Sequence, residues 1–359
     1  MKIHQLLVGA SPGDAITQMA LRLREALRFL GDSEIFALHI DDRINNHGLQ
    51  VRSAAEFPHM TTSDVVVYHA SMGEPFIDVL LKHTQAKIIL HYHNITPEHF
   101  FETTSPQHAL TSYWGRRQLQ VIRPLVHAVS AASHYNAKEL EEIGYNNIHV
   151  APVGLLPHRL VPLAFGVERN DLIERFADGY MITVSQQLPH KRIELAIQAL
   201  HLTQTVWEHP DFGLVVIGRT PDVRYAASLT TLARELRIPH VEFHSGAGDD
   251  FVASAISGAT ALVVTSDHEG LGIPAIEAMS LGTPVIARGC AATPDTLGNA
   301  AIVSTHTDGA EWIAASTHLL LTSPSACNEL VRRGHQRADE LEQAGSVWNY
   351  LHWLESVLS

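Results

Sequence analysis

Two glutamates and two glycines lie around a predicted strand-to-helix turn at residues 267–279, which read DHEGLGIPAIEAM. The preceding apolar run, residues 261–264, is typical of a buried strand, and Pro274 suits a first helical turn, where its missing N–H costs nothing. Glycines before a helix N-terminus leave backbone N–H groups uncovered, and the helix dipole adds positive charge, which favours an anion. Glu269 and Glu277 flank this turn, so the pattern indicates a ligand with hydroxyls on both sides of its phosphates. The alternative is an ordinary structural turn with solvated glutamates.

Three further segments carry residues that could do chemistry. The run 185–192, SQQLPHKR, follows a predicted strand and places Lys191 and Arg192 where they could meet phosphate or simply face solvent. His93 ends another predicted strand and shares a face with His91, so it could hydrogen-bond a sugar hydroxyl or serve as a packed histidine. The turn 9–14 lacks the G-x-G-x-x-G spacing of nicotinamide-binding proteins, but Gly13 could let backbone approach a phosphate or an acceptor.

Alternating strand-like and helix-like segments position these residues. In the first half, strands are expected at 4–8, 34–40, 64–68, 87–93 and 148–150, and a helix with leucines at helical spacing is expected to end at a Gly31 cap. In the second half, strands are expected at 181–184, 214–217, 241–244, 261–264, 284–287 and 301–303. Repeated alternation of this kind predicts parallel sheets covered by helices on both faces.

The pattern breaks near Val153 and continues as turn residues to Tyr180. We therefore expect a first domain at 1–155, a linker at 156–179 and a second domain at 180–359, with the alternative that the last helix packs on the first domain. Ligands of open α/β sheets bind outside the carboxyl ends of the strands, so two such sheets facing each other predict an interdomain cleft as the site.

Composition excludes several classes of function. A net charge of −13 argues against nucleic-acid binding, because phosphate neutralisation needs clustered Lys and Arg. The start of the chain runs straight into a predicted strand and no apolar run approaches a membrane span, so a cytoplasmic protein is expected. Cys290 and Cys327 have no ligand-like spacing, and most of the 24 histidines are scattered singly, so neither a disulfide framework nor a metal site is expected.

The segment 267–279 resembles the signature of retaining glycosyltransferases of family 4, E-G-x-G-x-P-x-x-E-A-M, with two glutamates separated by seven residues (E-x7-E). The continuation SLGTPVIA at 280–287 matches the same family, residues 129–144 resemble its strand and helix before the domain crossover, and residues 184–191 resemble its V-G-R-x-x-x-x-K segment. The resemblance covers most of the chain.

This resemblance implies an α/β fold of the GT-B type, with two facing Rossmann-like domains, of which 1–155 would be the acceptor-side domain and 180–359 the nucleotide-sugar-binding domain. It also implies transfer of a sugar from a nucleoside diphosphate to an acceptor with retained configuration. Glu277 would bind the donor ribose, Glu269 would contact the transferring sugar, and His93 would match the family's active-site histidine. Lys191 would offset the charge of the diphosphate, without any cofactor or metal ion. The remaining donor contacts would come from Gly13, Gln186, His244, Gly270, Leu271, Gly272 and Ile273.

The chain also departs from the family. Gln186 stands where the family usually has an arginine, and Val153 where the crossover usually has an asparagine. A neutral amide stabilises the charge of a diphosphate less than a guanidinium does. Gln186 is therefore consistent with three alternatives: a compensating Arg192 or Arg219, a different donor, or a weakened enzyme.

Two other functions stay open: a sugar-nucleotide epimerase of the GT-B fold, which would need no acceptor, and a catalytically weak accessory protein that binds sugar nucleotides. The acceptor would be a glycan, a lipid-linked sugar or a small molecule. A basic and aromatic stretch at 113–123 is consistent with peripheral contact to the inner face of a membrane or with an ordinary domain helix. The sequence does not define the oligomeric state.

Overall fold

The chain folds into two compact units. The computed structural model describes residues 1–46, 50–155, 157–166, 171–305 and 308–359. Unit 1 consists of Met1–Leu155 with Glu342–Ser359, and unit 2 consists of Leu156–Leu341. Residues 156–179, expected as a linker, thus belong to unit 2, and the C-terminal residues from 342 onward belong to unit 1.

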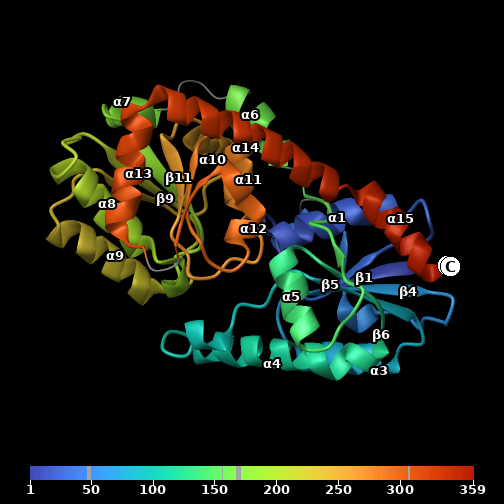
Figure 1. Cartoon of the computed structure of the whole chain (residues 1–359). Helices are drawn as coiled ribbons and strands as arrows, with labels where there is room; N and C mark the ends of the chain where they lie inside the picture. Colours follow the sequence, from blue (N-terminus) through green and yellow to red (C-terminus); the bar gives the residue numbers. More distant parts are fainter. Residues whose placement is uncertain (47–49, 156, 167–170, 306–307) are drawn as a thin grey trace. The chain divides into compact units, whose positions relative to one another are not determined.

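Unit 1 is built on a seven-stranded parallel sheet with the order β3-β2-β1-β4-β5-β6-β7 (Figure 1). The strands are β1 (Ile3–Ala10), β2 (Ile35–Ile40), β3 (Val51–Ser53), β4 (Val65–Ala70), β5 (Lys87–Tyr92), β6 (Val126–Ala131) and β7 (His149–Val150). The helices are α1 (Ala15–Leu27), α2 (Arg43–Asn46), α3 (Pro75–His83), α4 (Pro106–Ile122), α5 (His134–Glu142) and α15 (Val347–Leu358).

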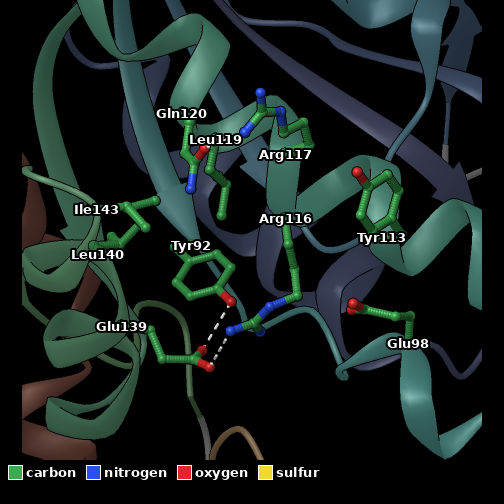
Figure 2. A pocket seen from close by; sticks show the side chains of 10 residues that line it. All are labelled: Tyr92, Glu98, Tyr113, Arg116, Arg117, Leu119, Gln120, Glu139, Leu140 and Ile143. Atoms are coloured by element: carbon green, nitrogen blue, oxygen red, sulfur yellow. Dashed lines mark hydrogen bonds and ion pairs between the residues drawn. The ribbon is translucent and has the colours of Figure 1, made fainter.

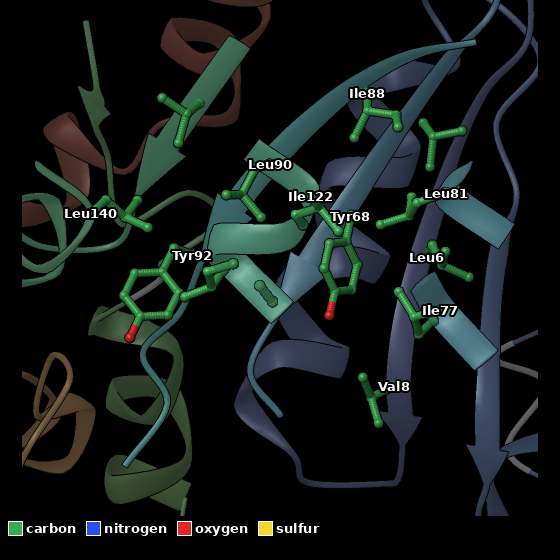
Figure 3. Packing of buried hydrophobic residues seen from close by; sticks show 14 of the residues in the cluster. Leu6, Val8, Tyr68, Ile77, Leu81, Ile88, Leu90, Tyr92, Ile122 and Leu140 are labelled. Carbon is green, nitrogen blue, oxygen red and sulfur yellow. The ribbon is translucent and has the colours of Figure 1, made fainter. Parts of the chain in front are cut away.

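Alternating side chains of β1 divide the core of unit 1 into two layers. Leu6 and Val8 pack with residues of α3, α4 and α5 on one face, where Tyr68 is fully buried (Figure 3). Ile3 faces the other side and packs with α1 and α15, including Tyr350. Gln5 and Leu7 point to this second face as well, because they alternate with Leu6 and Val8.

Unit 2 has a six-stranded parallel sheet with the order β10-β9-β8-β11-β12-β13. The strands are β8 (Tyr180–Val184), β9 (Gly213–Ile217), β10 (Val241–His244), β11 (Ala261–Val264), β12 (Val285–Arg288) and β13 (Ile302–Ser304). The helices are α6 (Val161–Gly166), α7 (Asp171–Arg175), α8 (Ile193–Thr205), α9 (Val223–Glu235), α10 (Asp249–Ser257), α11 (Ile273–Ser280), α12 (Thr293–Leu297), α13 (Ala310–Thr322) and α14 (Pro324–Ala344).

In each sheet the strand order reverses beside the first strand of the unit, at β1/β4 and at β8/β11. The carboxyl ends of strands at such a switch point form the usual ligand-binding crevice of an open α/β sheet. In unit 2 the segments that follow β8 and β11 are 185–192 and 265–272, which hold most of the predicted donor-binding residues.

Two local expectations are wrong, and one strand was missed. Gly31 does not cap the first helix, because α1 ends at Leu27 with Arg28 as its C-cap; Gly31 instead lies against the chain start, where an added Cβ would be 2.3 Å from the carbonyl oxygen of Met1. The segment after residue 156 is not only turns, since a 3-10 helix (Pro157–Leu160), α6 and α7 occupy part of it. The short edge strand β3 was not expected at all.

Candidate active site

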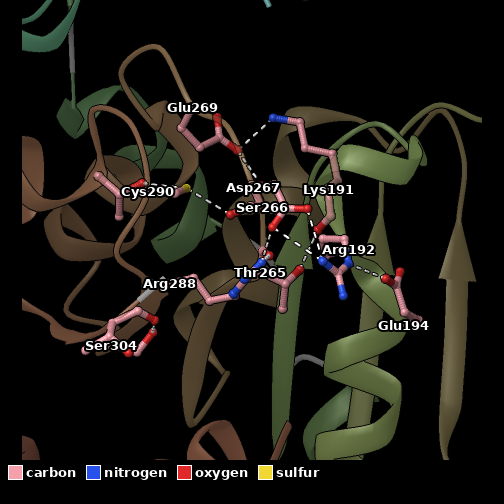
Figure 4. Close-up of polar contacts among 12 residues, drawn as sticks. Lys191, Arg192, Glu194, Thr265, Ser266, Asp267, Glu269, Arg288, Cys290 and Ser304 are labelled. Atoms are coloured by element: carbon pink, nitrogen blue, oxygen red, sulfur yellow. Dashed lines mark hydrogen bonds and ion pairs between the residues drawn. The ribbon is translucent and has the colours of Figure 1, made fainter. Parts of the chain in front are cut away.

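The segments after β8 and β11 are joined by hydrogen bonds at the switch point of unit 2. The Thr265 hydroxyl donates to the carbonyl of Lys191 at 2.6 Å, and the backbone N–H of Asp267 donates to the carbonyl of His190 at 2.8 Å. The Cys290 thiol, which follows β12, donates to the carbonyl of Ser266 at 2.9 Å. The first two bonds fix the loop that carries Glu269 against the loop that carries Lys191, and the third ties the Glu269 loop to the segment after β12 (Figure 4).

Lys191 and Glu269 form an ion pair in this loop cluster. Lys191 Nζ lies 2.7 Å from Glu269 Oε1, and the two side chains are only 17% and 16% exposed. The Ser266 hydroxyl donates to the same carboxylate oxygen at 2.6 Å. Burial acts to raise the pKa of Glu269, but the nearby Lys191 ammonium and the hydrogen bonds from Lys191 and Ser266 bring this pKa below its ordinary value. Glu269 is therefore an ionised carboxylate that holds an ammonium in place at neutral pH.

The N-terminus of α11 follows directly. Gly272 adopts a left-handed conformation with φ of 82°, and Pro274 occupies the first turn, as expected. Among the described residues no side-chain hydrogen bond caps this helix, and its first turn contains no acidic residue, so the positive end of the helix dipole lies at this loop. A cavity of about 20 Å³ lies here, lined by the ends of β8 and β11 together with Glu269, Gly272 and Pro274.

Glu277 lies in the second turn of α11 and pairs with a residue that the sequence did not single out. Arg159 Nε donates to Glu277 Oε1 at 2.6 Å, and Arg159 Nη1 donates to Asp249 Oδ2 at 2.8 Å. The Glu277 side chain is 4% exposed and that of Arg159 is 33% exposed. The Ser280 hydroxyl, one turn further along α11, bonds the carbonyl of Pro157, which anchors the Arg159 segment on the helix. Glu277 is therefore a buried carboxylate with one oxygen already oriented by a guanidinium.

The Arg192 guanidinium is already engaged by two carboxylates. Its guanidinium donates to Glu194 and to Asp267, and Asp267 also accepts from Arg288. Arg192 itself adopts a positive φ of 50°, a conformation that costs energy for a residue with a side chain and that these ion pairs help to hold. Arg192 is thus a structural residue here, and the idea that it compensates for Gln186 is not favoured.

Gln186 is exposed and follows β8, and Arg219 follows the neighbouring strand β9. The N–H of Gln187 donates to the carbonyl of Arg219 at 2.9 Å, and the N–H of Ser185 donates to that of Ile217. Gly218 lies between these bonds, and an added Cβ there would be 1.8 Å from the carbonyl oxygen of Ser185. Arg219 is exposed, and its side chain forms no ion pair with the described part of the chain.

His244 ends β10, the edge strand of the unit 2 sheet. Its Nε2 lies 3.0 Å from Glu242 Oε2, and its ring centroid lies 4.7 Å from that of Phe251. The predicted contact of His244 with the donor stays a prediction.

Unit 1 contains the other two predicted residues. Gly13 is exposed in the turn between β1 and α1, with φ of 74° and no atom near the place of a Cβ, and its role stays a prediction. His93 follows β5, and its Nε2 lies 2.8 Å from Nδ1 of His69 on β4. The rings of His91 and His93 lie 4.5 Å apart, as their shared face predicts. His93 is thus bound into a histidine cluster, which sequence spacing alone did not reveal for His69.

A separate cavity of about 280 Å³ opens between α4 and α5 of unit 1 (Figure 2). The Glu139 carboxylate accepts hydrogen bonds from Arg116 at 2.8 Å and from the Tyr92 hydroxyl at 2.9 Å. Tyr113 and Arg117 also line this cavity. Arg116 is therefore committed to an internal ion pair, whereas Arg117 Nη1 donates to the Gln120 amide oxygen at 3.0 Å.

Over the described ranges, no helix is both long and apolar enough to cross a membrane. Over the same ranges, no three His, Cys, Asp or Glu side chains are grouped so that they could hold a metal ion.

Known proteins resemble this chain in sequence and in fold. Residues 168–337 match the family described as glycosyl transferases group 1. The O-antigen chain mannosyltransferase RfbU of Salmonella typhimurium is 32% identical over 151 residues, which cover 42% of this chain and 41% of the relative. An MMP alpha-(1->4)-mannosyltransferase of Mycolicibacterium hassiacum is 34% identical over 110 residues, which cover 30% of this chain and 26% of the relative. The matched segments thus span less than half of these curated relatives.

Solved structures match over the whole chain. HepE of Anabaena, solved with UDP and glucose, superimposes with a TM-score of 0.74 at 14% identity and covers 100% of this chain and 99% of its own. The sucrose-phosphate synthase of Thermosynechococcus elongatus gives a TM-score of 0.75 at 17% identity, with 99% of both chains covered. Residues 168–337 therefore match the glycosyl transferases group 1 family, and the chain has the two Rossmann-like, parallel-sheet units of the GT-B fold.

Proposed function

We propose that this protein is a retaining glycosyltransferase of family 4 that moves a sugar from a nucleoside diphosphate to a hydroxyl of a glycan, glycolipid or small molecule. The observation that carries the proposal is the buried Lys191–Glu269 pair beside the uncapped N-terminus of α11. An ammonium and a set of backbone amides at a parallel-sheet switch point are what a diphosphate needs, and Glu269 adds a carboxylate for sugar hydroxyls.

In this proposal three parts of the donor contact unit 2, namely the diphosphate, the transferring sugar and the ribose. The diphosphate lies at the amides of residues 270–273 and draws the Lys191 ammonium away from Glu269. Glu269, relieved of its partner, accepts hydrogen bonds from the transferring sugar. Glu277 accepts hydrogen bonds from the two ribose hydroxyls, and Arg159 holds that carboxylate in the required orientation.

The reaction is a substitution at the anomeric carbon on one face of the sugar. The bond from the anomeric carbon to the diphosphate oxygen breaks, the bond to the acceptor oxygen forms, and the acceptor proton passes to the departing phosphate oxygen. Lys191 and the α11 dipole stabilise the negative charge that develops on that phosphate, so the proposal requires neither a metal ion nor a cofactor. His93 of unit 1 hydrogen-bonds a hydroxyl of the reacting sugars.

Arg219 replaces the charge that Gln186 lacks. Its backbone is tied to the Gln186 loop by the Gln187 bond, and its guanidinium is exposed. A guanidinium that reaches the diphosphate from this loop supplies the bidentate contact that a glutamine amide cannot. We expect Arg219→Gln to lower turnover, whereas the same change at Arg224, on the first turn of α9, serves as the control.

Mannose is the first sugar to test, because the curated relatives are mannosyltransferases. The experiment supplies the full chain with the mannose and glucose conjugates of UDP, GDP and ADP, with and without oligosaccharide acceptors. We expect acceptor-dependent release of one nucleoside diphosphate and, by NMR, a product with the anomeric configuration of the donor. Inverted product refutes the retaining mechanism, isomerised donor without acceptor supports the epimerase, and binding without turnover supports the accessory protein.

The proposal includes a peripheral contact with an anionic membrane at the cytoplasmic face. Helix α4 exposes four large apolar side chains, namely Leu110, Tyr113, Trp114 and Val121. Arg117 is the basic residue to neutralise, because removing Arg116 would break its pair with Glu139 instead. We expect Arg117→Gln to weaken binding to phosphatidylglycerol vesicles, with Arg52→Gln as an exposed control in the same unit. Wild-type protein that does not bind such vesicles contradicts this contact.

A further inference from the structure

A buried hydrogen-bond chain runs from Gln5 through His69 to His93 across three neighbouring strands of unit 1. Gln5 Oε1 lies 2.9 Å from His69 Nε2, and His69 Nδ1 lies 2.8 Å from His93 Nε2. The rings of His69 and His93 are nearly parallel, with centroids 5.1 Å apart and an interplanar angle of 16°. Gln5 and His69 are fully buried, so their hydrogen bonds are made within the protein.

The direction of each hydrogen bond follows from the Gln5 amide. Its Nε2 donates to the carbonyl of Ala20 at 2.9 Å, so its oxygen is the atom that faces His69. An amide oxygen can only accept, and therefore Nε2 of His69 carries a proton. Burial lowers the pKa of His69 to about 3, so the ring is neutral and its Nδ1 has a lone pair. That lone pair can only accept, so Nε2 of His93 donates to it.

The same logic defines the other nitrogen of His93. Burial, together with His91 and His69, holds the pKa of His93 well below its ordinary value, so this imidazole carries one proton at neutral pH. With that proton on Nε2, Nδ1 is a hydrogen-bond acceptor. A neutral ring with a fixed lone pair suits a sugar hydroxyl, and it adds no positive charge near an anomeric carbon that becomes positive as its bond to phosphate breaks.

We propose that Gln5 and His69 are positioning residues, which fix His93 as its Nε2–H tautomer so that Nδ1 accepts a hydrogen bond from a hydroxyl of the reacting sugars. The use of that lone pair rests on the proposed function. The tautomer itself does not, because it follows from the hydrogen bonds and the burial of these histidines within unit 1.

The first test is spectroscopic and needs no substrate. Long-range ¹H–¹⁵N correlation spectra of the full chain, with histidines labelled by ¹⁵N, distinguish a protonated ring nitrogen from a bare one. We expect His93 to show a protonated Nε2 and a bare Nδ1 from pH 6 to pH 8. A proton on Nδ1, or on both nitrogens at pH 7, overturns the proposal. If the predicted tautomer is found but no sugar transfer is detected, the proposed function has failed and the hydrogen-bond chain stands.

The second test replaces members of the chain. In His69→Leu the acceptor of His93 Nε2–H is lost, so we expect a mixture of His93 tautomers and a kcat at least about ten-fold lower, with the KM for donor little changed. His69→Asn offers an amide oxygen near the place of Nδ1 and should recover most of kcat. Gln5→Met should also give a mixture of the two His93 tautomers while keeping the shape of the core.

A matched control separates positioning from folding. His4 is also buried and precedes Gln5 on β1. It accepts a hydrogen bond from the N–H of Glu34 and is not a member of the Gln5–His69–His93 hydrogen-bond chain. His4→Leu should therefore leave the His93 tautomer and kcat unchanged. If His69→Leu does not fold, Gln5→Met and the wild-type spectra decide. A Gln5→Met protein whose His93 keeps a single Nε2–H tautomer overturns the proposal.

Discussion

Replacing Lys191 by methionine tests the buried pair at the centre of the candidate site. The change removes the ammonium, keeps most of the side-chain volume, and leaves Glu269 as a carboxylate that is only 16% exposed. Breaking a buried ion pair by removing one partner costs roughly 3–5 kcal/mol. Because the Ser266 hydroxyl still donates to Glu269, we expect the lower end, about 3 kcal/mol. That loss corresponds to a roughly 100-fold larger opening constant for unit 2.

The loss should depend on pH with a defined sign. In the wild type the pKa of Glu269 is lowered on folding, so its stabilisation is present above the unfolded pKa and is lost as pH falls through the folded pKa. In Lys191→Met burial is no longer offset, so we expect this pKa to be raised. A raised pKa stabilises at low pH and loses that contribution as pH rises. The difference between the two proteins should therefore be large at pH 7 and small near pH 4.

The measurement is amide hydrogen exchange in β8 and β11, because it reports the free energy of opening of unit 2 separately from unit 1. The double variant Lys191→Met/Glu269→Gln buries no unpaired charge and should recover most of the lost stability. A loss below about 1 kcal/mol at pH 7, the range of exposed pairs, or an equal loss at pH 4, refutes the reasoning.

Three other substitutions test single contacts. Arg159→Met removes the guanidinium that orients one oxygen of Glu277. We therefore expect steady-state kinetics to show a KM for donor about ten-fold higher at nearly constant kcat. A fall in kcat alone would contradict this role of Arg159. Gly272→Ala meets no neighbouring atom but forces a side chain to φ of 82°, so we expect a loss of about 1–2 kcal/mol in urea unfolding, and an unchanged midpoint is the contrary result. Gly73→Ala would put a Cβ 2.1 Å from the backbone nitrogen of Gly115, so we expect unit 1 to lose at least about 3 kcal/mol by hydrogen exchange, and wild-type protection would contradict that packing.

Local signals in the sequence predicted much of the fold. The expected strands agree with the observed ones within two residues, because buried parallel strands are short apolar runs bounded by turns. The turn at 267–279 could be predicted because glycine and Pro274 act on their own segment. β3 was missed because its three residues carry almost no pattern.

The partners of the site residues could not be predicted in this way. Arg159 and Glu277 are 118 residues apart, and Gln5 and His69 are 64 residues apart, so no spacing within either segment signals the contact. Only the fold brings these residues together. Gly31 shows a local signal that misleads. Its position after a helical pattern is typical of a helix cap, but its contact with Met1 determines its place.

The central claim is that unit 2 holds a nucleoside diphosphate at the start of α11, with its ribose on Glu277. Isothermal titration of the full chain with UDP, GDP and ADP tests this claim most directly. We predict that one of the three binds, and that Glu277→Gln weakens its binding by roughly 10–100-fold through loss of charged hydrogen bonds to the ribose. Binding of none of the three, or equal affinity in Glu277→Gln and the wild type, would contradict the account.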